Sequence, residues 1–453
     1  MTGLRRSLGL LDATMANVGV IIGSAVFLTA GDVARALPQP LLQLGVWGLA
    51  ALFSLAGALT IAELGAALPR AGGLCVYLHE AFGVFWGFLY GWSLLLVIQT
   101  SAIAAVAVAF ASYGAHFVPL SPHGLELVAV AGIVALTAVN VLGVREGVWT
   151  QNAVTFAKLL VIGGLIALAF GKGSGSAANL SPAGRAWTLA GLGTAVIGPL
   201  FAFDGWITTS YIGGEVKEPG RNLPLSALLS IAIVAVVYLA LNAAYLFVLG
   251  SEGVAASTLV ATDTARALLG ERGADVAAVM VLLATVGGLN GNILGGARVL
   301  YAMAQTGLFW RAAGHVHPRF GTPATALAVQ GAISIAFVFT GRFEQLLASC
   351  LFASWLFYGL GGLAVFALRR RHDLERPYQV WGHPVVPAAF IAFAAVFLVM
   401  AVAADPRDTA LGAALLLTGV PAYLFFKRRA AAHQLALRSS SARAPSPSTG
   451  GEK

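Results

Sequence analysis

The chain has 453 residues, of which 58% are hydrophobic and only 10% are charged, and its formal net charge is +8. Apolar stretches of about 20 residues recur from end to end, and a soluble domain could not bury that much apolar surface. The basic residues stand between these stretches and in the tail rather than on one face, so they indicate membrane topology and not a nucleic-acid surface. Composition therefore predicts an all-α integral membrane protein.

The apolar stretches divide into twelve predicted spans. The first follows Arg5 and Arg6, contains Asp12 and lacks a small-residue cleavage site, so we expect it to be retained rather than removed as a signal peptide. Each span is long enough to cross roughly 30 Å of hydrocarbon at about 1.5 Å per residue. The spans cover residues 9–36, 41–67, 80–113, 122–143, 149–171, 187–214, 224–250, 273–305, 323–340, 345–369, 384–403 and 408–426.

The distribution of Lys and Arg predicts the orientation of these spans. With the amino terminus inside, nineteen basic residues fall on the cytoplasmic side and seven on the outside, and Lys158 lies near the middle of the membrane. The positive-inside rule favours this orientation, so we expect a multi-pass protein of the inner (plasma) membrane with both termini in the cytoplasm. The inside set includes Arg298, and the outside set is Arg35, Lys172, Arg185, Arg266, Arg272, Arg342 and Arg407.

Two of the predicted spans contain a helix break at the same relative position. The first span carries Gly and Ser within residues 19–25, and the sixth carries Gly and Pro within residues 198–205. Both residue types are common in membrane helices, so each segment alone is weak evidence. Five spans separate the two breaks, and five crossings reverse the orientation of a repeat. We therefore expect two inverted halves, residues 9–171 and 187–369, followed by two further spans within 384–426.

Unwound backbone at these breaks is a candidate binding site for a zwitterion. N–H and C=O groups without helical partners cannot face lipid, so they must line a cavity and bind something polar. The start of the outer half of span 1 offers N–H donors and a positive dipole end to a carboxylate, and the carbonyls of both breaks can accept from an ammonium. The candidate donors are Gly23, Ser24 and Ala25, and the remaining candidate contacts are Val20, Ile21, Phe201, Ala202, Phe203, Asp204 and Gly205.

Two charged residues belong to this candidate region. Lys158 stands in an apolar run from about residue 149 to 170, with no acidic residue nearby in sequence. A lone ammonium at the centre of a membrane helix costs roughly 3 kcal/mol on insertion scales, so it must face a polar interior and find partners. Asp204 adjoins the second break, where it either contacts an amine or caps the outer half of span 6. Lys158 is therefore a functional candidate, and both roles of Asp204 stay open.

The segments outside the spans are less informative. Residues 250–274 mix charged and apolar side chains and predict a short amphipathic helix over the outer face. Residues 1–8 form a cytoplasmic amino terminus, and the Ser-, Ala-, Arg- and Pro-rich segment 427–453 predicts a disordered cytoplasmic tail. His315 and His317 have a metal-like spacing without an acidic or Cys partner nearby, so neither a metal nor a cofactor is expected.

Several motifs are shared with one transporter superfamily. They include Gly19-Val-Ile-Ile-Gly-Ser-Ala-Val-Phe27, Ala62-Glu63-Leu64-Gly65, Pro69-Arg70-Ala71-Gly72-Gly73, Phe201-Ala-Phe-Asp-Gly-Trp206, Gly214-Glu215, Asn222-Leu223-Pro224, Gly295-Gly296-Ala297-Arg298 and Thr322-Pro323. With these motifs the chain resembles the amino acid, polyamine and organocation superfamily, and most of all the L-type amino acid transporters and bacterial alanine-serine-cysteine exchangers. The likeness covers roughly residues 8–425 and implies a LeuT-like fold, a 5+5 inverted repeat with two C-terminal helices.

The resemblance also implies roles for individual residues. Gly23, Ser24 and Ala25 match the unwound segment that holds the substrate carboxylate, while Val20 and Phe201 to Phe203 match the carbonyls around the substrate amine. Lys158 matches a lysine whose ammonium takes the place of a bound sodium ion and ties span 1 to span 8, which implies sodium independence. Asn290 is its expected neighbour in span 8.

Two departures from the family pattern bear on substrate and partners. Ala25 stands where the family usually has a third small Gly, so its methyl group affects the substrate range rather than the binding mode. Animal relatives couple to a single-span glycoprotein through a cysteine between spans 3 and 4. This chain has no cysteine there, so no disulfide-linked glycoprotein subunit is expected.

Residues and resemblance together predict a sodium-independent transporter of small neutral L-amino acids that works by alternating access, preferably as an exchanger. Two alternatives are a proton-coupled symporter, with Lys158 as the proton carrier, and an antiporter of cationic amino acids or polyamines, for which Asp204 is the only candidate acid in the site. An intramembrane enzyme would need paired acids, a Ser/His constellation or metal ligands at one depth, and the sequence contains none of these.

Overall fold

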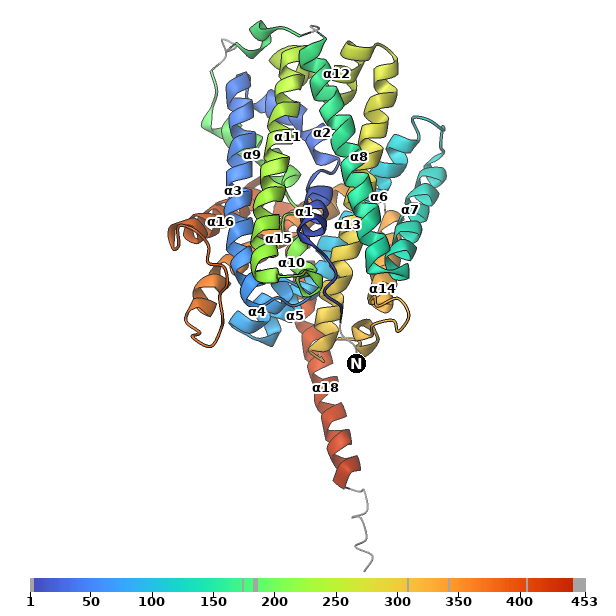
Figure 1. The fold of residues 1–453 in the computed structure, drawn as a ribbon, viewed down its shortest axis with the longest axis vertical. Helices are drawn as coiled ribbons and strands as arrows, with labels where there is room; N and C mark the ends of the chain where they lie inside the picture. Colours follow the sequence, from blue (N-terminus) through green and yellow to red (C-terminus); the bar gives the residue numbers. More distant parts are fainter. Residues whose placement is uncertain are drawn as a thin grey trace, which may run out of the picture.

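The protein folds as a bundle of helices (Figure 1). A computed structural model describes residues 4–172, 175–181, 186–307, 309–340, 343–404 and 406–442, with the backbone alone for 343–349, 404, 408 and 431–442. Its described residues contain no β-strand, only an isolated bridge between Leu8 and Val216. The all-helical membrane fold expected from composition is confirmed. Arg185 and Arg342 lie outside the described residues, and so do residues 443–453 of the predicted tail.

The first half of the chain runs from α1 to α8. Several of these helices begin where their sequence favours an N-terminus: α3 and α7 open on Pro40 and Pro122, and the Ser121 hydroxyl accepts from the N–H of Gly124 at 3.1 Å. A π-helical turn, Leu94–Ile98, joins α5 to α6. The helices are α1 (Leu10–Ile21), α2 (Ala25–Ala36), α3 (Pro40–Ala67), α4 (Leu74–Phe82), α5 (Val84–Ser93), α6 (Gln99–Gly114), α7 (Pro122–Leu142) and α8 (Val144–Gly171).

The second half continues to α15, and three helices follow it. α11 begins on Pro219 and kinks at Gly250, whose φ is +70°. The helices are α9 (Leu189–Ala202), α10 (Thr208–Tyr211), α11 (Pro219–Ala256), α12 (Val260–Leu269), α13 (Arg272–Gln305), α14 (Ala324–Val338), α15 (Phe343–Arg369), α16 (Val385–Ala404), α17 (Pro406–Leu417) and α18 (Gly419–Ala442). Short 3-10 turns occur at Ala177–Leu180, Gly213–Glu215 and Arg311–Gly314.

The lengths and hydropathies of these helices support a many-span membrane protein. Within the described residues, nine helices are long and apolar enough to cross a membrane, and the bent pair α1 and α2 makes a tenth as one broken span. α9 and α14 are shorter apolar helices at the positions of two further predicted spans, 187–214 and 323–340. The count of twelve and the inverted repeat remain predictions.

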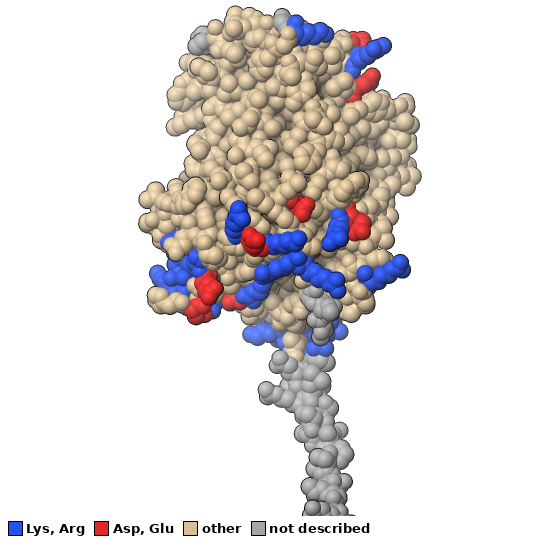
Figure 2. All heavy atoms as spheres, viewed as in Figure 1, with Lys and Arg blue, Asp and Glu red and all other residues tan. Residues whose placement is uncertain are grey.

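The two ends of the bundle differ in charge. The N-terminus and α18 lie at the same end, which we call the terminal end, and α12 lies at the opposite one (Figure 1). Lys and Arg gather mainly at the terminal end, and an uncharged flank separates them from the few charges opposite (Figure 2). α12 confirms that a short helix forms within 250–274, and it buries Val260 and Leu268. α18 continues the chain as helix from 427 to Ala442, in the first part of the predicted tail.

α1 lies inside the bundle, in contact with α8, α11 and α13. Side-chain hydrogen bonds fix it there, because Asn17 accepts from the N–H of Thr209 at 2.9 Å and Asp12 accepts from Asn152 at 2.8 Å. The first break is therefore held beside the helices that carry Lys158 and Asn290.

Candidate functional site

The first helix break separates α1 from α2. α1 ends at Ile21, α2 begins at Ala25, and the two helices are bent by 49°. Between them Ile22 has φ −77° and ψ 76°, and the N–H of Gly23 donates to the carbonyl of Ile21 at 2.8 Å. These are the dihedrals and the hydrogen bond of an inverse γ-turn. The break predicted in the first span is confirmed.

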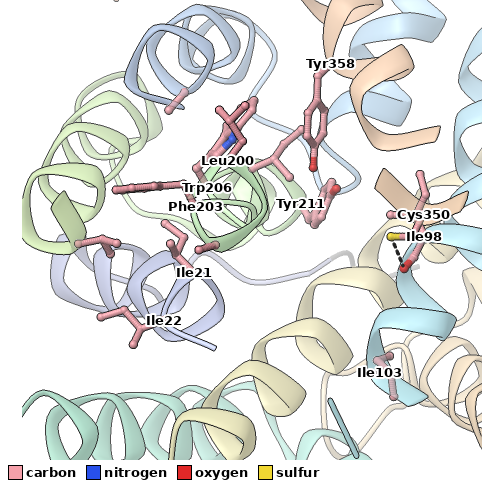
Figure 3. Close-up of a cluster of buried hydrophobic side chains, with 14 of the residues drawn as sticks. Ile21, Ile22, Ile98, Ile103, Leu200, Phe203, Trp206, Tyr211, Cys350 and Tyr358 are labelled. Carbon is pink, nitrogen blue, oxygen red and sulfur yellow. Dashed lines mark hydrogen bonds between the residues drawn. The ribbon is translucent and has the colours of Figure 1, made fainter. Parts of the chain in front are cut away.

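The second break follows α9 and touches the first. α9 ends at Ala202 and α10 begins at Thr208. Gly205 between them has a φ of +116°, which L side chains rarely adopt, and a Cβ added there would lie 2.7 Å from Val20 Cγ1. Only glycine fits between the two breaks. Figure 3 shows Ile21 on one side of this junction and Phe203 on the other.

Lys158 of α8 binds the first break directly. Its side chain is fully buried, and its Nζ donates to the carbonyls of Gly19 and Ile22 at 2.7 Å each. Gly287 of α13 closes another side, since a Cβ added there would lie 3.0 Å from Nζ. Within the described residues Lys158 forms no salt bridge. The ammonium therefore donates to one carbonyl at the end of α1 and one in the break rather than to a carboxylate, and it lies between α1 and α13.

Asn290 lies one turn from Gly287 on α13, and its hydrogen bonds go to other partners than Lys158. Its Nδ2 donates to the Gly147 carbonyl at 3.0 Å and to Gln151 Oε1 at 2.9 Å, and its Oδ1 accepts from Asn140 at 2.8 Å. These bonds join α13 to α7 and α8. Asn290 thus lies beside the helix that carries Lys158. The α13 residue that comes closest to the Lys158 ammonium is Gly287.

Tyr238 of α11 joins the two breaks, and the sequence analysis did not identify it. Its hydroxyl lies 2.8 Å from the Ile21 carbonyl and 3.0 Å from the Ala202 carbonyl, and its side chain is fully buried. A hydroxyl has one proton, so it donates to either carbonyl or shares the proton between them. The sequence does carry one signal for this residue, a tyrosine within an apolar span, because a buried hydroxyl needs a hydrogen-bond partner.

The start of α2 presents free donors at the junction. Among the described residues, no hydrogen bond forms from the backbone N–H of Ser24, Ala25 or Val26, and no side chain caps this end. Gly23, Ser24 and Ala25 are half-buried. The N-terminus of a helix attracts anions through its N–H groups and its dipole. This end of α2 can therefore hold a carboxylate.

The carbonyls around the junction are occupied to different degrees. Tyr238 binds those of Ile21 and Ala202, and the carbonyl of Phe201 accepts from the N–H of Asp204 at 3.0 Å. Val20 is half-buried, and no described residue outside α1 donates a hydrogen bond to its carbonyl. Val20 therefore offers the most available acceptor among the predicted ones.

Phe203 and Asp204 occupy different surroundings although they are adjacent. The Phe203 ring is fully buried against Tyr238 and Trp47, with centroids 5.0 and 6.5 Å away, so it belongs to the packed core. Asp204 is half-buried, and its Oδ1 accepts from the Gly205 N–H and from the Tyr358 hydroxyl of α15, both at 2.9 Å. Its carboxylate thus binds the break to α15 and does not cap α10. Figure 3 shows Tyr358 near the second break.

A buried ion pair lies next to the start of the chain, toward the terminal end. Arg298 Nε donates to Glu215 Oε1 at 2.8 Å, and the two side chains are 0% and 1% exposed. The backbone carbonyl of Glu215 accepts from the N–H groups of Ser7 and Leu8 at 2.9 and 3.0 Å. Arg298, which the sequence analysis counts among the cytoplasmic basic residues, is thus a buried partner of Glu215, and through Glu215 it ties α13 to the start of the chain.

The larger surface grooves, of about 710 and 760 Å³, are lined by other residues than this junction. Clusters of three or more metal-ligating side chains are also missing from the described part of the chain. What the junction offers is free N–H donors at one helix start, a free carbonyl nearby and a fixed buried cation. This combination suits a ligand that carries both a carboxylate and an ammonium.

Comparison with known proteins agrees with this chemistry. Residues 8–425 match the amino acid permease family. The chain is 32% identical over 433 residues to the serine/threonine exchanger SteT of Bacillus subtilis (strain 168), covering 95% of this chain and 98% of that protein. It is 31% identical to the mouse Asc-type amino acid transporter 1 over 93% of this chain and 81% of that protein, and 30% identical to the human cystine/glutamate transporter over 93% and 85%. The chain therefore belongs to the amino acid permease family, and it is a membrane transporter of amino acids rather than an enzyme.

Proposed function

We propose that the protein is a sodium-independent exchanger of small neutral L-amino acids that works by alternating access. The observation that carries this proposal is the Lys158 ammonium on the carbonyls of Gly19 and Ile22, a fixed cation at the unwound turn. A protein that supplies this charge itself has no need of a sodium ion there. The relative SteT, named as a serine/threonine exchanger, supports exchange and small neutral substrates.

The substrate binds across the junction of the two breaks. Its carboxylate accepts from the free N–H groups of Ser24 and Ala25 at the start of α2, beside Gly23, whose own N–H donates to the Ile21 carbonyl in the γ-turn. Its ammonium donates to the carbonyl of Val20 and to carbonyls of the second break. Gly205 keeps the two breaks in contact, and the methyl group of Ala25 limits the space for the substrate side chain.

Tyr238 adds a step to this scheme. Its hydroxyl occupies the carbonyls of Ile21 and Ala202, which are also acceptors for the substrate amine. Bound substrate therefore displaces the hydroxyl from one carbonyl, and the freed phenol can bind the substrate in turn. Substrate arrival is in this way coupled to the contact between α11 and both breaks.

The membrane arrangement follows the sequence interpretation. Spans 1–5 and 6–10 form inverted halves over residues 9–171 and 187–369, and two further spans lie within 384–426. The terminal end faces the cytoplasm of the inner membrane, which is supported by the Lys and Arg side chains gathered there (Figure 2). No disulfide-linked glycoprotein subunit is needed, because the loop between spans 3 and 4 carries no cysteine.

The test is uptake of radiolabelled alanine and serine into liposomes that contain the purified protein, with or without unlabelled amino acid inside. We expect uptake only into preloaded vesicles, unchanged by sodium and by a proton gradient. Lys158→Ala should abolish it, because two buried carbonyls lose their donor. Lys172→Ala, at the end of the same helix, is the matched control, since Lys172 bonds the carbonyl of Leu268 instead. Uptake into empty vesicles driven by a proton gradient would contradict the exchange mode and favour the symporter.

A further inference from the structure

A groove of about 710 Å³ lies on the flank of the bundle, away from the substrate site. Its apolar walls come from α3, through Leu59 and Ala66, and from α11, through Leu225 and Leu228. The third wall is the segment before α16, which includes Pro377 and Trp381. A groove between two membrane helices with such walls is open to hydrocarbon chains.

The third wall is held firmly in place. Arg369 donates to both oxygens of Glu63 at 2.7 Å, and Glu63 also accepts from the N–H of Val380 at 2.8 Å. A Cβ added at Gly220 would lie 2.7 Å from Pro377 Cγ, so this segment also packs on the first turn of α11. The groove is thus a preformed feature of three anchored elements.

One end of the groove is charged. Glu218, the N-cap residue of α11, and Arg221 in its first turn line the groove. Their side chains lie 3.7 Å apart and are each 72% exposed, and Lys217 beside them is exposed as well. Lys217 and Arg221 carry two positive charges and Glu218 carries one negative charge, so this end of the groove, its rim, has a net positive charge. The backbone contacts of Lys217 with Leu8 place this rim at the terminal end, where basic side chains gather (Figure 2).

Apolar walls that lead to a basic rim match an amphipathic ligand with a negative head. Arginine binds phosphate oxygens in a bidentate manner, and basic sites near the ends of spans favour anionic lipids. Trp381 is 66% exposed at the same groove, and exposed tryptophans prefer the interface between hydrocarbon and head groups. A water-soluble anion would leave the apolar walls uncovered.

We propose that this groove binds one anionic phospholipid, with its phosphate on Arg221 and an acyl chain between α3 and α11. The lipid braces α11 against α3, and α11 also carries Tyr238 of the substrate junction. Bilayers rich in anionic lipid should therefore stabilise the protein through this groove. This binding is independent of which amino acid is transported.

The experiment uses the full chain, purified in detergent and stripped of lipid. Phosphatidylglycerol, phosphatidylcholine with the same acyl chains, or inorganic phosphate is added, and both the melting temperature and the lipid retained in native mass spectrometry are measured. A ligand that binds the folded state raises the melting temperature. We expect phosphatidylglycerol to raise it most and one such lipid to be retained.

Two variants separate the rim from the walls. Arg221→Gln should weaken phosphatidylglycerol binding about five-fold, the effect of one basic residue near a membrane surface, while Arg311→Gln, another exposed arginine, should not. Leu228→Trp, which fills the groove, should reduce retention of the lipid while leaving the melting temperature without lipid unchanged. Equal effects of Arg221→Gln and Arg311→Gln, equal stabilisation by phosphatidylcholine, or the same shift with inorganic phosphate would overturn the proposal.

Discussion

Replacing Arg298 alone is expected to destabilise the protein far more than replacing both members of its ion pair. Arg298→Met leaves the Glu215 carboxylate, 1% exposed, without the guanidinium that donates to it at 2.8 and 3.4 Å. Breaking one side of a buried pair costs about 3–5 kcal/mol, whereas replacing both partners by apolar side chains is often neutral. The double variant with Glu215→Met should therefore regain most of the lost stability.

Thermal unfolding in detergent, followed by the fluorescence of the nine tryptophans, measures this difference. We expect the wild type and the double variant to have similar melting temperatures, and Arg298→Met to melt well below both. Arg371→Met is the matched control, because its pairs with Glu80 and Asp373 are solvent-accessible, with Arg371 41% exposed, and such pairs contribute about 1 kcal/mol or less. Equal melting temperatures for Arg298→Met and wild type, or a double variant as unstable as the single one, would refute the reasoning.

Labelling of Cys75 reports whether the same pair keeps the terminal end closed. The Cys75 thiol is 3% exposed and lines a groove that Leu4 and Gly214 also line, next to Glu215. In a Cys350→Ser background, Arg298→Met should increase the rate at which a maleimide reacts with Cys75. An unchanged rate would mean that the pair contributes stability without holding this end shut.

Three further variants test the junction and the Asn290 contacts near it. Tyr238→Phe should slow exchange and lower stability by about 1–3 kcal/mol, because the carbonyls of Ile21 and Ala202 lose the one hydroxyl proton that they share. Exchange rates and melting temperatures measure this effect, and wild-type values for both would contradict it. Gly205→Ala should abolish exchange, since its φ of +116° and the 2.7 Å approach to Val20 exclude a methyl group. Gly48→Ala is the control and should transport normally, because a Cβ added there meets nothing within 4 Å. Asn290→Ala should lower the melting temperature as strongly as Tyr238→Phe, and a smaller drop would mean that its amide contacts contribute little.

The sequence alone determines that this protein folds in a lipid bilayer. Hydrophobic runs of span length force the backbone into helices, because lipid offers no hydrogen-bond partner. Gly and Ser within 19–25, and Gly and Pro within 198–205, weaken the helix at two places whatever their neighbours are, and the structure breaks at both. Lys158 had to be buried against acceptors, since hydrocarbon does not solvate an ammonium.

Only the tertiary structure decided which groups meet at those places. Tyr238 reaches the carbonyl of Ile21 across 217 residues of chain, and Arg298 reaches Glu215 across 83, so no local pattern marks either contact. The close approach of α13 to Lys158 occurs at Gly287, where the absence of a side chain makes room, and a search for polar partners selects Asn290 instead. The sequence determines what each residue requires, such as a hydrogen-bond partner or a neighbour without a Cβ. Packing determines which distant residue meets that requirement.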